Sequence, residues 1–105
     1  MRFKLFDSQA KAKEILEHNQ PRLVRAGDKE ICLLRSGESL FAFQNACSHM
    51  GENLHTGKVN YLNEIVCPLH TYRFNIKTGE EAQQRCGALK TYPITASSEG
   101  IFVEC

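Results

Sequence analysis

The chain has 105 residues and a formal net charge of +1. A chain of this length builds one modest core, so we expect a single domain spanning residues 1–105. The near-neutral charge gives no field that favours nucleic acid or an anionic membrane, so neither is expected as a partner. No apolar run has the length of a membrane-spanning helix, and residues 1–13 lack the apolar segment of a signal peptide. The sequence therefore predicts a soluble, cytoplasmic protein.

One short N-terminal helix is expected within SQAKAKEILEHN, residues 8–19. Ser8 is a suitable N-cap, and Pro21 stops the helix. Three apolar residues recur at the spacing of one inward face: Ala12, Ile15 and Leu16.

After Pro21 the chain reads as short strands separated by turn residues such as Gly, Asp and Ser. The strand segments are RLVRA (22–26), EICLLR (30–35), SLFAFQ (39–44), NEIVC (63–67), YRFNI (72–76), ALKTYPIT (88–95) and GIFVEC (100–105). The first three segments form two successive hairpins. Short strands at this spacing predict an all-β fold, a small antiparallel sandwich or barrel.

Two loops each carry one cysteine and one histidine, as C-x-H at Cys47 and His49 and C-x-x-H at Cys67 and His70. A tetrahedral Cys2His2 zinc site could use these four residues in a zinc-stabilised binding module. Structural zinc sites, however, usually take two cysteines from one turn and often two histidines from a helix. A Rieske [2Fe–2S] cluster holds one iron by two cysteines and the other by two histidines. Because two facing loops can each supply one ligand to each iron, the repeated order favours the cluster.

Long segments around these loops resemble the Rieske-type ferredoxins: SLFAFQNACSHMGENLHTGKV, EIVCPLHTYRFNIKTGEE, and LKTYPI followed by GIFVEC. The resemblance implies a Rieske fold of antiparallel sheets, with two loops at one tip that bind one [2Fe–2S] cluster per chain. It carries over Cys47 and Cys67 as ligands of the inner iron. It carries over His49 and His70 as ligands of the outer iron.

The chain also departs from the high-potential Rieske proteins of respiratory complexes. Those proteins bridge their two loops by a disulfide, and the matching positions here are Glu52 and Leu69. Their serine and tyrosine, which donate hydrogen bonds to the cluster sulfurs, are replaced by Tyr72 and Phe74. Many ferredoxins of the family have glycine where this chain has Thr71. The lost hydroxyl pattern predicts a potential low in the Rieske range, about −150 mV.

The chain has five cysteines, an odd number that argues against a disulfide framework. Outside the ligand set, Cys32 lies in an apolar segment and is expected as a small buried hydrophobe. Cys86 lies in EAQQRCGA, which matches the third loop of the family, and is expected as a surface cysteine.

Histidine ligation suits electron transfer, because two ferric ions, two sulfides and two thiolates sum formally to zero and accept an electron more readily than a dianion. A Rieske oxygenase also needs a mononuclear iron held by two histidines and a carboxylate. Only His18 and His55 remain for such a site, so we expect an electron carrier with no catalytic residues. Its expected partners are a flavin-dependent reductase as donor and a Rieske-type or other oxygenase as acceptor. The alternative is a Rieske-like small subunit of an assimilatory nitrite reductase, which shares the fold.

Overall fold

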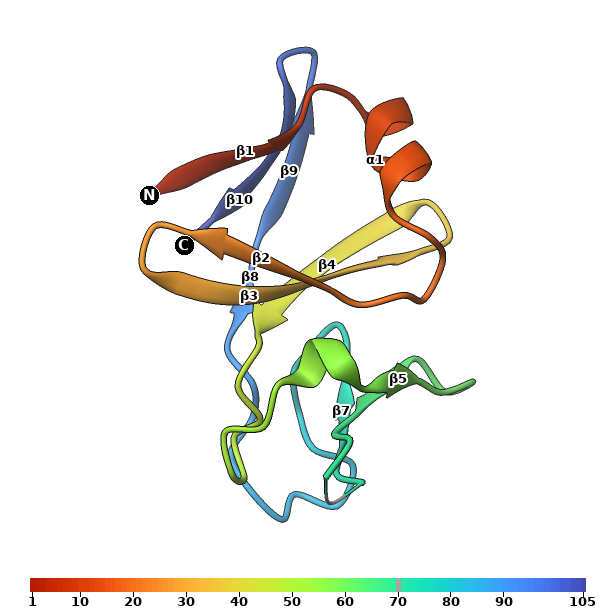
Figure 1. The fold of residues 1–105 in the computed structure, drawn as a ribbon, viewed down its shortest axis with the longest axis vertical. Helices are drawn as coiled ribbons and strands as arrows, with labels where there is room; N and C mark the ends of the chain where they lie inside the picture. Colours follow the sequence, from red (N-terminus) through yellow and green to blue (C-terminus); the bar gives the residue numbers. More distant parts are fainter. Residues whose placement is uncertain (70) are drawn as a thin grey trace.

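The computed structural model describes residues 1–69 and 71–105 as three antiparallel sheets and one helix (Figure 1). The elements in chain order are β1 (Arg2–Phe6), α1 (Gln9–Ile15), β2 (Arg22–Ala26), β3 (Lys29–Ser36), β4 (Ser39–Gln44), a short 3-10 turn η1 (Leu54–Thr56), β5 (Lys58–Val59), β6 (Glu64–Val66), β7 (Arg73–Asn75), β8 (Thr91–Tyr92), β9 (Ile94–Ser97) and β10 (Gly100–Glu104). The strand orders are β1-β10-β9, β2-β3-β4-β8 and β5-β6-β7. This architecture confirms the all-β class with one short helix, and β2, β3 and β4 form the two predicted hairpins.

Strand β3 separates two apolar cores, because side chains on a strand alternate between its two faces. Ile31 and Leu33 face the upper core, which lies towards α1 and β10. Cys32 and Leu34 face the lower core, which lies towards β6 and β7. The upper core comprises Leu16, Ala26, Ile31, Leu33, Ala42, Tyr92 and Val103. The lower core comprises Cys32, Leu34, Phe43, Cys47, Leu54, Ile65, Cys67, Phe74, Ile76 and Leu89.

Burial of Cys32 is confirmed, and the apolar surroundings raise the pKa of its thiol to about 12. A thiol with this pKa stays protonated at neutral pH and acts as a small hydrophobe.

Helix α1 begins as predicted, because the Ser8 hydroxyl accepts a hydrogen bond from the Lys11 N–H at 3.1 Å. Ala12 and Leu16 are buried, as expected, but Ile15 is 41% exposed and lies off the inward face.

The predicted end of this helix was wrong, since α1 ends at Ile15 and not near Asn19. Leu16 is already extended, and its carbonyl accepts a hydrogen bond from Arg35 Nε at 2.6 Å. The Asn19 N–H donates to the Arg35 carbonyl at 2.7 Å. These contacts with β3 replace the next helical turn, so the helix has ended well before Pro21.

Strand β1 was missed by the sequence reading. Its Phe3 and Leu5 are half-buried against the upper core and alternate with the exposed Arg2 and Lys4. That alternation is a strand signal that the sequence does carry. The partner strand β10 lies at the other end of the chain, with Arg2 opposite Glu104.

The three-stranded sheet β5-β6-β7 lies at the opposite end of the long axis from β1, β10 and α1 (Figure 1). The two Cys/His loops connect β4 to η1 and β6 to β7, and both lie at this lower tip. Within residues 1–69 and 71–105, no helix has the length and apolar character needed to cross a membrane.

Candidate metal centre

The two Cys/His loops are closed by the same pair of backbone hydrogen bonds. In each loop the cysteine N–H donates to the carbonyl five residues later, and the cysteine carbonyl accepts from the N–H four residues later. These distances are 2.8 and 2.7 Å around Cys47, and 2.8 and 3.0 Å around Cys67. The residue four positions on is left-handed in both loops, with φ of +76° at Gly51 and +57° at Thr71. The chain therefore builds one turn twice, although the histidine lies one position later in the second loop.

Both turns direct their cysteines into the lower core, where Cys47 and Cys67 are 2% and 1% exposed. Burial raises the pKa of the Cys47 thiol above its ordinary value. The backbone N–H groups of His49 and Met50 donate to the Cys47 sulfur and lower this pKa, whereas the adjacent Cys67 thiol raises it further. The two thiols therefore face each other in an apolar environment. A metal centre would bind them as thiolates, and the N–H donors would stabilise that charge.

His49 is more exposed than the two cysteines of this thiol pair. Its ring is half-buried, and its Nδ1 is turned away from solvent. The ring stacks on Tyr72, with ring centroids 4.2 Å apart and planes inclined by 18°. The first loop thus reaches across to the second loop through this aromatic pair. His70, the fourth predicted ligand, lies outside the described residues.

The donor set fits a [2Fe–2S] centre with mixed ligation. Two facing buried thiols and an inward-turned imidazole nitrogen are the ligand types that such a centre requires. In the part of the chain that the structure describes, no three His, Cys, Asp or Glu side chains form a group that could hold a single metal ion. Met50 and Leu69 flank the histidine positions and are 64% and 56% exposed, so the tip presents apolar side chains to solvent.

The sequence reading missed Glu81, which the structure buries beside the second loop. Its side chain has no exposed surface, and it accepts hydrogen bonds from Arg85 Nε at 3.0 Å and Nη2 at 2.8 Å. Backbone N–H groups of Arg73, Gln83 and Arg85 also donate to it. The Arg85 guanidinium is the main reason that the pKa of this carboxyl falls to about 2, and the backbone donors add to the shift. An acidic and a basic residue four apart, outside any helix, were the only sequence signal.

Residues 81–88, which we call the third loop, also contact the first ligand loop. The Ser48 hydroxyl donates to the Gly87 carbonyl and lies 3.4 Å from the Cys86 sulfur. Cys86 is partly exposed, as expected for a surface cysteine, but it also packs against the lower core. The third loop brings Cys86 to this position, because the loop packs beside Ser48 of the first ligand loop.

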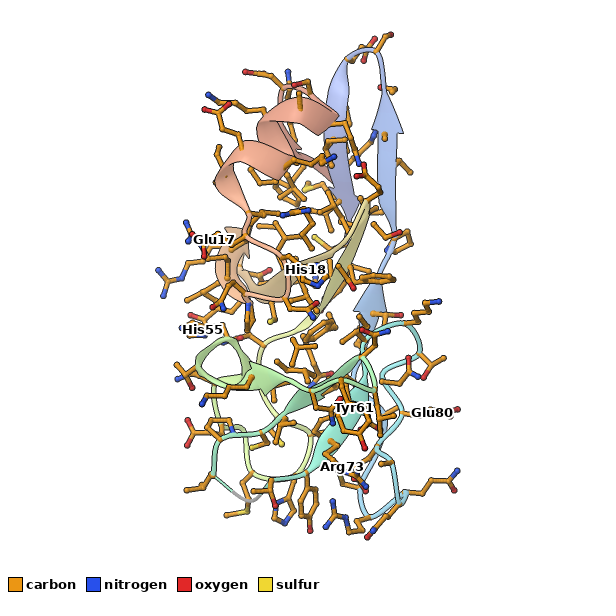
Figure 2. All side chains as sticks on the ribbon, turned by 90° about the vertical axis from the view of Figure 1, so that its right-hand side faces the viewer. Glu17, His18, His55, Tyr61, Arg73 and Glu80 are labelled. Atoms are coloured by element: carbon orange, nitrogen blue, oxygen red, sulfur yellow. The ribbon has the colours of Figure 1, made fainter. Side chains whose placement is uncertain are left out.

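His55 lies away from the tip, on the flank between the upper and lower parts of the molecule (Figure 2). The buried Asn45 holds it, because Asn45 Oδ1 accepts from the His55 N–H at 2.9 Å. The Asn45 carbonyl also accepts from the Leu54 N–H at 2.8 Å. Asn45 therefore fixes the return of the first ligand loop, and His55 takes no part in the centre.

The sequence profile of the Rieske [2Fe-2S] domain family matches residues 8–93. The chain belongs to this family. It is 33% identical over 82 residues, 77% of the chain and 78% of the relative, to the ferredoxin component of the naphthalene 1,2-dioxygenase/salicylate 5-hydroxylase systems of Ralstonia sp. The family match confirms a [2Fe–2S] cluster as the cofactor and overturns the zinc alternative. The protein is a Rieske-type ferredoxin, an electron carrier and not an enzyme.

Solved structures agree with this assignment. The ferredoxin of carbazole 1,9a-dioxygenase from Nocardioides aromaticivorans IC177 is 29% identical, with a TM-score of 0.79 over 87% of this chain and 89% of that one. A complex of reduced oxygenase and oxidized ferredoxin in carbazole 1,9a-dioxygenase contains a chain that is 23% identical, with a TM-score of 0.80. The match covers 96% of this chain and 99% of that one. A putative nitrite reductase small subunit from Mycobacterium tuberculosis, 18% identical (TM-score 0.79; 98% and 95% covered), shares the fold.

Proposed function

We propose that this ferredoxin passes single electrons from a flavin-dependent reductase to a ring-hydroxylating oxygenase. The partner class is supported by the Ralstonia relative, which is a component of dioxygenase systems, and by the ferredoxin of carbazole 1,9a-dioxygenase from Nocardioides aromaticivorans, which is 29% identical. The likeness to the nitrite reductase subunit lies in the fold alone, at 18% identity, and does not favour that alternative.

We propose Cys47 and Cys67 as ligands of the inner iron and His49 and His70 as ligands of the outer iron. The observation that carries this proposal is the repeated turn, which brings the two cysteine thiols face to face in the lower core. When bound, the cluster supplies a one-electron couple. The lower core excludes water from the thiolates, and the N–H groups of the first loop stabilise their charge. His49, at the outer side, links the centre to the surface of the tip.

We also propose that residues 1–105 form one Rieske domain in the cytoplasm. Strands β1, β9 and β10 all lie outside the matched segment 8–93, and they pair in one sheet that covers the upper core. This pairing supports one folding unit. None of the five cysteines forms a disulfide in the structure, which agrees with a reducing compartment.

The ligand proposal is tested by iron and acid-labile sulfide analysis together with the visible spectrum. We expect about two irons and two sulfides per chain. Alanine at any of the four ligand positions should abolish the native spectrum. Cys105→Ser changes a cysteine that follows β10, far from the tip, and should keep the spectrum. One tightly held zinc and no iron after anaerobic reconstitution would contradict the proposal.

The partner proposal is tested by electron delivery. The iron-loaded protein should be reduced by a nicotinamide-dependent flavin reductase and reoxidised by a ring-hydroxylating oxygenase with its aromatic substrate. Co-purification with a large sirohaem enzyme, and no electron transfer to any ring-hydroxylating oxygenase, would instead support the nitrite reductase alternative.

A further inference from the structure

We infer that Arg85 is a positioning residue for His49 and acts through the ring of Tyr72. The inference rests on the proposed role of His49 as an iron ligand. It assigns a function to the third loop, which supplies none of the proposed ligands.

The geometry is a stack of three flat groups. The His49 and Tyr72 ring centroids are 4.2 Å apart, and the Arg85 Cζ lies 3.9 Å from the Tyr72 centroid. Two flat groups this close to one ring centroid would overlap on the same face, so the imidazole and the guanidinium lie on opposite faces. Tyr72 is therefore held between a proposed ligand and a cation, and cation–π attraction favours this arrangement.

Arg85 is itself fixed from behind by the buried Glu81. Both Nε and Nη2 of Arg85 donate to the carboxylate, at 3.0 and 2.8 Å, which orients the plane of the guanidinium. The carboxylate is held in turn by three backbone N–H groups, those of Arg73, Gln83 and Arg85. A guanidinium with this support restricts the tilt of the Tyr72 ring, and the Tyr72 ring restricts that of His49.

The third loop also ties the two ligand loops together. It reaches the first loop through Ser48, which donates to Gly87, and the second loop through Tyr72 under Arg85. Figure 1 shows this segment, in blue, running along the lower tip beside both loops. Glu52 and Leu69 cannot form the bridging disulfide, so the contacts of the third loop hold the two ligand loops in position relative to each other.

The stack also places a positive charge behind the ring that contacts His49. Reduction adds negative charge to the centre, and a nearby cation stabilises that charge. Loss of Arg85 should therefore lower the reduction potential, and loss of the aromatic ring should change the environment of the histidine-bound iron.

The test compares four variants as iron-loaded proteins: Tyr72→Phe, Tyr72→Leu, Arg85→Gln and Arg73→Gln. The readouts are the EPR g-values of the reduced protein and the voltammetric midpoint. Tyr72→Phe retains the ring and should keep the wild-type g-values, whereas Tyr72→Leu should shift them. Arg85→Gln should lower the midpoint. Arg73→Gln is the matched control, because Arg73 directly follows the second loop but its side chain pairs with Glu64 at 3.5 Å, outside the stack.

Two results would overturn the inference: unchanged g-values in Tyr72→Leu, or equal midpoint shifts in Arg85→Gln and Arg73→Gln. If Tyr72→Leu or Arg85→Gln loses the cluster, the test instead compares Arg85→Lys with Arg73→Lys. Lysine keeps the positive charge but lacks the planar guanidinium that stacks on Tyr72. A larger shift of the g-values in Arg85→Lys than in Arg73→Lys supports the positioning role of Arg85, and equal shifts in the two variants refute that role. Iron and sulfide content of the wild-type protein is measured alongside. A wild-type protein without the cluster refutes the proposed function, whereas loaded variants without spectral change refute only the stack.

Discussion

Gly51 and Thr71 occupy the same left-handed position in the two ligand loops, four residues after Cys47 and Cys67. Glycine adopts this conformation freely, but a β-branched residue does so at a cost of about 1–2 kcal/mol. The second loop therefore carries local strain at the position where many ferredoxins of the family have glycine.

Thr71→Gly should stabilise the protein by about 0.5–1 kcal/mol, because relief of the strained φ exceeds the extra chain entropy of glycine. The measurement is the urea midpoint of the iron-loaded protein, followed by visible absorption and far-UV circular dichroism. Gly51→Ala is the reciprocal change and should lower the midpoint, although its Cβ would meet no atom within 4 Å. A lower midpoint in Thr71→Gly would show that threonine contacts outweigh the backbone strain.

Glu81→Gln should destabilise the protein by about 2 kcal/mol at pH 7, because it removes the buried carboxylate that accepts hydrogen bonds from Arg85 and from three backbone N–H groups. The folded-state pKa of Glu81 is about 2, below its ordinary value of 4.5. The carboxylate therefore contributes its full stability above pH 4.5 and loses it as the pH falls towards 2.

The difference in urea midpoint between the wild type and Glu81→Gln should accordingly become smaller as the pH is lowered from 5. Urea midpoints measured from pH 7 to the lowest pH at which the cluster is retained test this trend. Glu38→Gln is the control, since Glu38 pairs with Lys13 on the exposed surface and its loss should change the midpoint little. A difference that stays constant over this pH range would contradict the prediction.

Mild thiol reductant should leave the visible lineshape and the thermal midpoint unchanged. Glu52 and Leu69 stand at the two positions that would bridge the loops, and none of the five cysteines forms a disulfide in the structure. Mass spectrometry before and after reduction, with the spectrum, checks this. Detection of a native Cys–Cys bond, with cluster loss when it is reduced, would refute the prediction.

The midpoint potential should lie near the low end of the Rieske range, about −150 mV, because Phe74 cannot donate a hydrogen bond to a cluster sulfur. Phe74 is fully buried in the lower core together with Cys47 and Cys67. Phe74→Tyr should raise the potential by introducing a hydroxyl donor there. Voltammetry of this variant, with Phe102→Tyr in the distant strand β10 as control, tests the argument. A wild-type midpoint above about +100 mV would contradict the low-potential assignment.

The sequence by itself determined the features that depend on neighbouring residues. Turn residues and alternating apolar positions were enough to predict the two hairpins of β2, β3 and β4, and Ser8 marked the start of α1. The order of cysteine and histidine in the two loops favoured a [2Fe–2S] cluster over a zinc site, and the resemblance to the Rieske-type ferredoxins supported the same cofactor.

Only the tertiary structure decided the features that depend on distant residues. The end of α1 was set by Arg35, a β3 residue whose side chain bonds the Leu16 carbonyl. The stack of His49, Tyr72 and Arg85 joins all three loops at the tip. No local pattern encodes such contacts, because their free energy depends on which surfaces the folded strands bring together. The sequence therefore determined the proposed ligands and the cofactor, whereas packing decided what surrounds them.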